Sequence, residues 1–96
     1  WTVNGCDKTD QEYAKSAAPN VMLRMFTVKQ ATPTQPQLDT SGSWVEAAPN
    51  TVGNFSATGY FFGRALQESL KVPVGIINTS VGGTRIEAWM SQSALE

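Results

Sequence analysis

The segment Val72–Ser93 decides the fold, and it reads Val-Pro-Val-Gly-Ile-Ile-Asn-Thr-Ser-Val-Gly-Gly-Thr-Arg-Ile-Glu-Ala-Trp-Met-Ser-Gln-Ser. Its apolar, β-branched start, Val74–Ile77, is typical of a strand that is covered on both faces in a parallel sheet. A short polar stretch follows, and then the pair Gly82 and Gly83. Because ligands in open α/β sheets bind beyond the carboxyl ends of such strands, we expect this strand to deliver a loop to a functional site.

The paired glycines allow more than one interpretation. Glycine adopts positive φ and has no Cβ, so the N–H groups of Gly82 and Gly83 can approach a substrate oxygen closely, as an oxyanion hole requires. The same pair can serve as a tight strand exit in which glycine only relieves steric crowding. A phosphate-binding loop at a helix N-terminus is a weaker interpretation, because the lysine of a P-loop is lacking and Glu87 would repel phosphate.

Three stretches of the chain carry a resemblance to a known family: Pro19–Val28, Val52–Arg64 and Asn78–Trp89. The last is similar to the Ser-x-Gly-Gly-Thr-x-Ile-Glu-Ala-Trp segment of the sialate O-acetylesterases, carbohydrate esterases of the SGNH (GDSL-like) hydrolase superfamily. The resemblance covers nearly the whole chain and is weakest in Lys29–Ser43. It implies an α/β fold, a three-layer sandwich with a parallel sheet of the SGNH-hydrolase or flavodoxin-like kind. Residues 1–96 would form the N-terminal part of one such esterase domain.

The resemblance also implies a partial active site. Family members carry a Gly-Gln-Ser-Asn-Met segment before a tryptophan that Trp1 matches, so the nucleophilic serine is expected four residues before Trp1, outside this chain. The matched motif assigns an oxyanion-hole donor to Gly82, with Gly83 and Asn78 as alternatives. Val81 stands where many family members have an aromatic residue, which predicts a reshaped acyl pocket or sugar platform.

The resemblance places the catalytic base of the expected site outside the chain, whereas the candidate substrate contacts lie within it. The family's Gln-Gly-Glu segment and its Asp-x-x-His pair belong after Glu96, so we expect residues 1–96 alone to be inactive. Trp44, Arg85 and Trp89 are candidate substrate contacts. For Trp44 and Trp89 a packing role is the alternative, and a helical turn after the glycines would put Arg85 and Trp89 on one side.

The expected activity is removal of O-acetyl groups from sialic acid or a related acetylated glycan by a serine esterase without a cofactor. The family resemblance favours an extracellular or periplasmic location. The alternative is a non-catalytic carbohydrate-binding or interaction module on the same scaffold, with Trp44, Trp89 and Tyr60 as stacking surfaces. A serine four residues before Trp1 supports the enzyme, whereas alanine or glycine there supports the module.

Composition argues against several other classes. The chain has seven Lys and Arg and eight Asp and Glu, so its net charge is -1. It therefore lacks the excess positive charge that is typical of proteins that bind nucleic acid. The apolar runs fall far short of the ~20 residues of a membrane span. Cys6 is the only cysteine and histidine is absent, so an internal disulfide, a Cys/His zinc site and a self-contained Ser-His pair are all excluded within the chain. We expect no metal, and we interpret Cys6 as a loop thiol.

Local patterns predict a βαβ unit, formed by strand Val21–Val28, helix Ser56–Leu70 and strand Val74–Ile77. Asn54 or Ser56 can cap the helix. Gly59 and Gly63 lie four residues apart on that helix, where each costs about 1 kcal/mol relative to alanine, and close helix-on-sheet contact would explain them. Arg24 is expected to reach solvent or a nearby carboxylate, with a substrate-carboxylate clamp as the alternative.

Three further segments complete the prediction. A helix over Asp10–Ala18 is expected to start at a capping box formed by Thr9 and Glu12 and to carry Tyr13 on its apolar side. Ser43–Ala47 is either a short edge strand or an extended segment. Lys29–Ser43 combines prolines with polar residues and is expected to be an exposed excursion within the domain.

Overall fold

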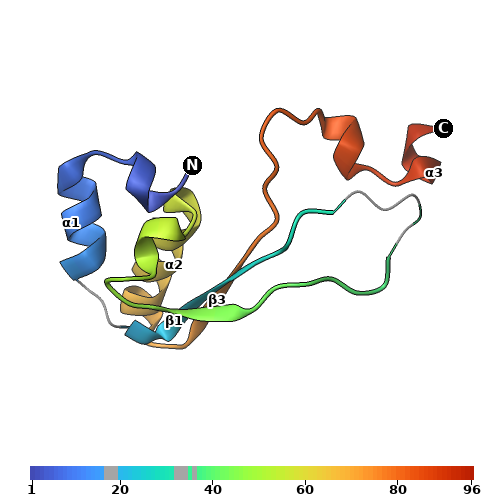
Figure 1. The fold of residues 1–96 in the computed structure, drawn as a ribbon. Helices are drawn as coiled ribbons and strands as arrows, with labels where there is room; N and C mark the ends of the chain where they lie inside the picture. Colours follow the sequence, from blue (N-terminus) through green and yellow to red (C-terminus); the bar gives the residue numbers. More distant parts are fainter. Residues whose placement is uncertain (17–19, 32–34, 36) are drawn as a thin grey trace.

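The computed structural model describes residues 1–16, 20–31, 35 and 37–96. Three strands form one mixed sheet of order β2-β1-β3, in which β3 is parallel to β1 and β2 is antiparallel to it. Figure 1 shows the sheet beside the helices, with two long segments extending away from both. The elements in chain order are η1 (Val3–Gly5), α1 (Lys8–Ser16), β1 (Asn20–Thr27), β2 (Trp44–Ala47), η2 (Val52–Asn54), α2 (Ala57–Leu70), β3 (Val74–Asn78), η3 (Ile86–Trp89) and α3 (Gln92–Leu95).

The expected βαβ unit is present, and the α/β class is confirmed. Strands β1 and β3 pair in parallel from Leu23 beside Val74 to Thr27 beside Asn78, with α2 in the connection between them. Between β1 and α2 the chain also forms β2, so the segment left open in the sequence is an antiparallel edge strand. The Ser56 side chain accepts a hydrogen bond from the Gly59 N–H and caps α2, as expected.

The two glycines of α2 are explained by its contact with the sheet. A Cβ on Gly63 would lie 2.9 Å from Ile76 Cγ1 and 3.0 Å from Leu23 Cδ1. A Cβ on Gly59 would lie 3.1 Å from Ile76 Cγ2. Because real Cβ atoms rarely come this close to a neighbour, glycine lets the helix backbone approach β1 and β3, as the sequence predicts.

The expectation that the strands are covered on both faces is wrong for the described residues. Leu23 and Met25 point toward α2 and are 2% exposed. On the opposite face, Trp44 is 51% exposed and Ile77 is 62% exposed. The described part of the chain therefore supplies two layers, the sheet and the helices on one side of it, and no second helical layer covers the other face.

Helix α1 starts earlier than the sequence indicates. It begins at Lys8, and the Asp10 N–H donates to Asp7 Oδ1 at 3.1 Å. The Asp7 side chain therefore caps the first turn of the helix by accepting from one of its free N–H groups. Thr9 already lies inside the helix, so it cannot form the predicted capping box with Glu12. The predicted end of the helix, at 17–18, lies outside the described residues.

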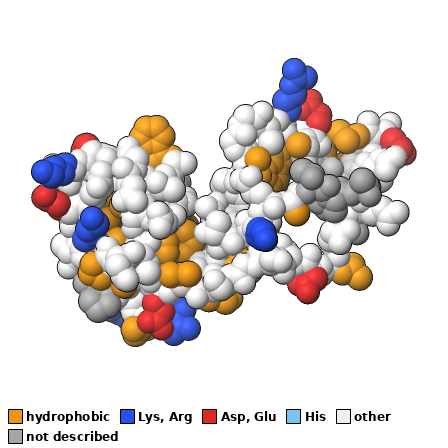
Figure 2. Space-filling model, viewed as in Figure 1, with side chains coloured by type: hydrophobic (Ala, Val, Ile, Leu, Met, Phe, Trp, Pro, Cys, Tyr) orange, Lys and Arg blue, Asp and Glu red, His pale blue; other side chains and the backbone are white. Residues whose placement is uncertain are grey.

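Two segments lead away from this body at the carboxyl ends of β1 and β3, and we call them the arms. The first arm is residues 28–43 as far as they are described, and the second is residues 79–96 (Figure 1). They start side by side, because the Val28 N–H donates to the Asn78 carbonyl at 3.0 Å. Every residue of the second arm is exposed. Figure 2 shows the same division in space-filling form, with a narrower part between body and arms.

Candidate active site

The N-terminal residues reach the carboxyl edge of the sheet. Helix α2 runs antiparallel to β1 and β3 and ends near the start of β3. Its first turn therefore lies at the edge of the sheet where β1 and β3 end. At that turn the Ala57 N–H donates to the Trp1 carbonyl at 3.1 Å, and Thr2 forms a β-bridge with Ser56. Trp1 therefore lies at the same edge of the sheet as the loop that follows β3 (Figure 1).

The glycine pair forms an open turn at the start of the second arm. Of the two, only Gly83 has positive φ, at +75°. A Cβ on Gly82 or Gly83 would meet nothing within 4 Å, and neither N–H makes a hydrogen bond to the described residues. The glycines therefore do not relieve crowding here, and the Gly82 N–H is free to donate to a ligand. Positive φ at the second of two central residues is the pattern of a type II turn.

Asn78, the alternative donor, has a role in shaping this loop. Its Oδ1 accepts a hydrogen bond from the Ser80 N–H at 3.1 Å, and its carbonyl accepts one from Val28. The side-chain oxygen therefore fixes the exit of β3 in an Asx-type turn. The side-chain nitrogen of Asn78, Nδ2, makes no hydrogen bond to the described residues, so it too can donate to a ligand.

Thr84 connects the glycine turn to Trp89, a link that the sequence reasoning missed. The Thr84 hydroxyl donates to the Val81 carbonyl at 2.7 Å and accepts from Trp89 Nε1 at 2.9 Å. These bonds fold η3 back toward the turn and fix one edge of the indole, which is 50% exposed. A threonine directly after the glycine pair is the only signal in the sequence that could have indicated this contact.

A groove of 530 Å³ lies between the two arms, and we call it the arm groove. Trp89, Ala88 and Val81 line it from the second arm, and Lys29 and Asp39 line it from the first. The groove begins just beyond the carboxyl ends of β1 and β3, the position at which ligands collect in open α/β sheets. Of the predicted substrate contacts, the structure places Trp89 at this groove.

The other two predicted contacts lie elsewhere. Trp44 packs on the open face of the sheet, with its ring centroid 5.4 Å from that of Phe26 and its indole over Gly75. Arg85 is exposed, precedes η3 in extended conformation and does not line the groove. The helical turn starts only at Ile86, so the expected grouping of Arg85 with Trp89 on one helical side is wrong.

Arg24 has a structural partner. It lies beside Glu46 on the neighbouring strand, and its Nη2 is 3.2 Å from Glu46 Oε1. Both side chains are about half exposed, and such surface pairs contribute about 0–1 kcal/mol. The expectation that Arg24 reaches a nearby carboxylate is confirmed.

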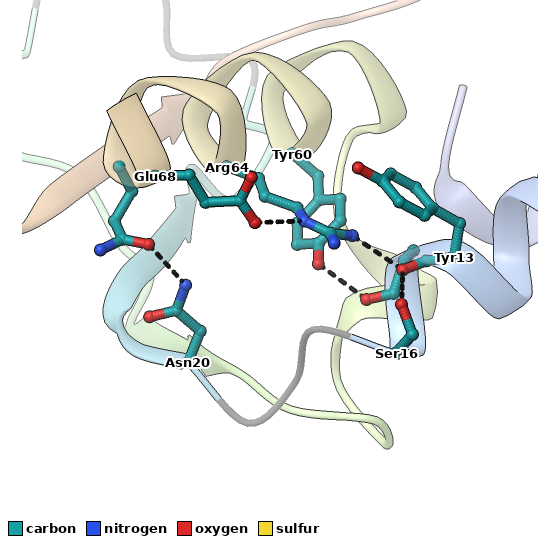
Figure 3. Close-up of polar contacts among 8 residues, drawn as sticks. Tyr13, Ser16, Asn20, Tyr60, Arg64 and Glu68 are labelled. Carbon is teal, nitrogen blue, oxygen red and sulfur yellow. Dashed lines mark hydrogen bonds and ion pairs between the residues drawn. The ribbon is translucent and has the colours of Figure 1, made fainter. Parts of the chain in front are cut away.

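A polar cluster attaches the N-terminal segment to α2 (Figure 3). The Tyr60 hydroxyl donates to the Ala14 carbonyl and Arg64 Nη1 donates to the Tyr13 carbonyl, both at 2.7 Å. The Arg64 guanidinium also lies 4.0 Å from the centroid of the Tyr13 ring and is paired with Glu68. The predicted packing role of Tyr13 is thus confirmed. These contacts satisfy carbonyls at the end of α1 that have no partner within the helix.

The charges in this cluster are adjusted by their surroundings. Burial raises the pKa of Tyr60, against the opposing effect of the Arg64 charge. Burial disfavours the charge on Arg64, but the hydrogen bond to Glu68 and the charge interactions with Tyr60, Tyr13 and Glu68 together outweigh burial, so the pKa of Arg64 is raised. Tyr60 is 1% exposed, so it cannot serve as the stacking surface that the carbohydrate-binding module would require.

The described residues form no group of three or more His, Cys, Asp or Glu that could hold a metal ion. Cys6 is partly buried, and its thiol lies 3.8 Å from the Thr2 carbonyl. Among the helices in the described ranges, none has the length and apolarity to cross a membrane.

The fold of the described residues is similar to that of a solved carbohydrate acetylesterase. A solved structure of a carbohydrate acetylesterase from Xanthomonas citri superimposes with a TM-score of 0.85 at 38% identity, over 92% of this chain and 20% of that one. Sialate O-acetylesterase from Rattus norvegicus is 35% identical over 82 residues, 77% of this chain and 15% of the relative. The mouse protein of that name is 40% identical over 63 residues, 62% of this chain and 12% of the relative.

These matches confirm the resemblance to the sialate O-acetylesterase family. No protein-family model matches the chain. The chain spans 15% or less of the length of these two relatives, so it corresponds to a small part of such a protein.

Proposed function

We propose that the chain is part of a serine carbohydrate esterase that removes O-acetyl groups from sialic acid or a related acetylated glycan. One observation carries the proposal. Trp1 and the Gly82 turn, which lie at opposite ends of the sequence, both lie at the carboxyl edge of the sheet. If the serine expected four residues before Trp1 is present, this arrangement would bring it to the edge of the sheet that also carries an unpaired backbone donor.

In the proposed reaction the serine hydroxyl attacks the acetyl carbonyl. The ester bond to the sugar then breaks, and the sugar leaves with a free hydroxyl group. Water then releases acetate from the acyl-enzyme. The oxygen of the tetrahedral intermediate carries the negative charge that forms in each step, and the Gly82 N–H donates to it. A donor of this kind typically lowers the barrier by about 2.7–4 kcal/mol. Gly82 suits this role because its N–H has no partner among the described residues and lies in open space.

We also propose that residues 1–96 are the N-terminal part of one SGNH-type esterase domain. The serine nucleophile would precede them and the aspartate and histidine would follow. On this proposal the isolated chain does not hydrolyse an acetyl ester, because it holds neither nucleophile nor base.

The substitution Gly82→Pro in the complete protein tests the donor. Proline removes the N–H, and the first central position of a type II turn tolerates its fixed φ, so the fold should survive. We expect kcat on an acetyl ester to fall roughly 10²-fold or more. Near-UV circular dichroism checks that the protein remains folded. Gly82→Ala is the matched control, because it keeps the N–H and its Cβ enters open space.

Full activity in a folded Gly82→Pro protein would show that Gly82 is only a turn residue. Gly83 or Asn78 would then be the better donor. Equal losses in Gly82→Pro and Gly82→Ala would point to the shape of the turn rather than to its N–H.

A further inference from the structure

We propose that the arm groove binds an acetylated sugar acid and that Lys29 recognises the carboxylate of that sugar. The inference rests on the proposed esterase function and adds the residue by which the site selects an acidic sugar. Neither Lys29 nor any other residue of the first arm was among the sequence-predicted site residues.

The lining of the arm groove suits a sugar. Trp89 supplies an aromatic surface, and the hydrogen bond from its Nε1 to Thr84 fixes its orientation. Gln37, Thr40 and Asp39 add amide, hydroxyl and carboxylate groups on the opposite arm. Sites for small polar ligands combine apolar and aromatic surface with a few placed polar groups in this way. The mixture favours a ring with one apolar face and several hydroxyls.

Lys29 is the one cation among the described residues that line the groove. Its backbone is fixed at the base of the first arm, because its N–H donates to the Ser41 carbonyl at 2.9 Å. The preceding residue, Val28, is bonded to Asn78 at the end of β3. Lys29 therefore starts from the edge that also carries the proposed oxyanion donor.

The Lys29 ammonium forms no ion pair with the described residues, in which the only ion pairs are Arg24–Glu46 and Arg64–Glu68. Asp39 also lines the groove, but its Oδ1 accepts from the Thr40 N–H at 2.8 Å and it lies beyond ion-pair distance of Lys29. The charged residues of η3 and its start, Arg85 and Glu87, do not line the groove. A ligand carboxylate would therefore find one available ammonium.

The test compares two substrates that differ at one group, which is either a charged carboxylate or its uncharged methyl ester. They are an O-acetylated sialic acid and its carboxyl methyl ester, with acetate release by the complete protein as the readout. Because Lys29 is exposed, we expect wild type to prefer the free acid by about 2- to 5-fold in kcat/KM. Lys29→Gln should abolish that preference. The wild-type preference should also shrink as salt is added, because salt screens exposed charges.

Lys15→Gln is the matched control. Lys15 is exposed on α1, and its substitution removes one positive charge, as Lys29→Gln does. Lys29→Arg should retain the preference. If wild type hydrolyses both substrates equally, or if Lys29→Gln keeps the wild-type preference, the inference is overturned while the esterase function stands. If wild type hydrolyses neither substrate, the proposed function itself fails, and the inference fails with it.

Discussion

The body of the molecule, residues 1–27 and 44–78 as described, buries Leu23, Met25 and Tyr60 to 2% exposure or less, whereas the second arm leaves Ile86 71% exposed and Trp89 50% exposed. Apolar residues in the body pack on one another across elements that are far apart in sequence. Those in the arms line a groove or face solvent. The comparison indicates that the βαβ body determines the fold, and that the segments leaving its carboxyl edge carry the features on which function depends.

Proteolysis should give the largest contrast between the two regions. The arms can be cut without opening the core, whereas cleavage inside α2 requires the body to unfold. We expect a nonspecific protease to cut the isolated chain within Lys29–Ser43 first, and within the arms roughly 10²-fold or more faster than within α2. Mass spectrometry of the early fragments gives the order. Early cuts inside α2 would contradict the comparison, and digestion at all sites together would show that the chain does not fold alone.

Large-to-small substitutions should differ next most. Leu23→Ala leaves a cavity between β1 and α2 and should lower the free energy of unfolding by about 2–5 kcal/mol. Ile86→Ala removes an exposed side chain and should change it by less than about 0.5 kcal/mol in the isolated chain. Urea unfolding followed by circular dichroism compares the two variants. Similar losses for both would mean that the second arm packs on the body after all.

Added methyl groups should show the smallest difference. In Gly63→Ala the new Cβ meets Ile76 and Leu23, and such overpacking costs about 1–3 kcal/mol. The better helix propensity of alanine offsets about 1 kcal/mol of that cost, so a net loss of roughly 1 kcal/mol is expected. Gly82→Ala meets nothing and should leave the urea midpoint unchanged. A Gly63→Ala variant as stable as wild type would show that α2 can move away from the sheet without cost.

Much of the body could be predicted from sequence because its signals are local. Local patterns in the sequence predicted the βαβ unit, and the glycines of α2 predicted its close packing on the sheet. The start of α1 was misplaced because Asp7 and Thr9 are both good capping residues, and only the backbone decides between them. The role of Arg64 was missed because its acceptor, the Tyr13 carbonyl, lies 51 residues away.

The site was predictable only in part, for a related reason. Gly82 and Trp89 belong to one motif, so their proximity could be read from a single segment. The arm groove has two walls, and no periodicity in the sequence indicates that Lys29 and Asp39 line the wall opposite Trp89. The position of Trp44 was equally hidden, since an edge strand can point an indole toward either face of a sheet and only pairing with β1 fixes which.

The attachment of α1 to α2 has a consequence for the order of events during synthesis. The bonds from Tyr60 and Arg64 to the end of α1 span 46 and 51 residues. At about 5–20 residues per second, α2 leaves the ribosome roughly 2 to 10 s after the N-terminal segment. During that interval Trp1–Ser16 lacks the surface of α2 to which it is bonded in the folded chain. On the proposed function, the segment that leads from the nucleophile is therefore held in place only after the chain has been translated through α2.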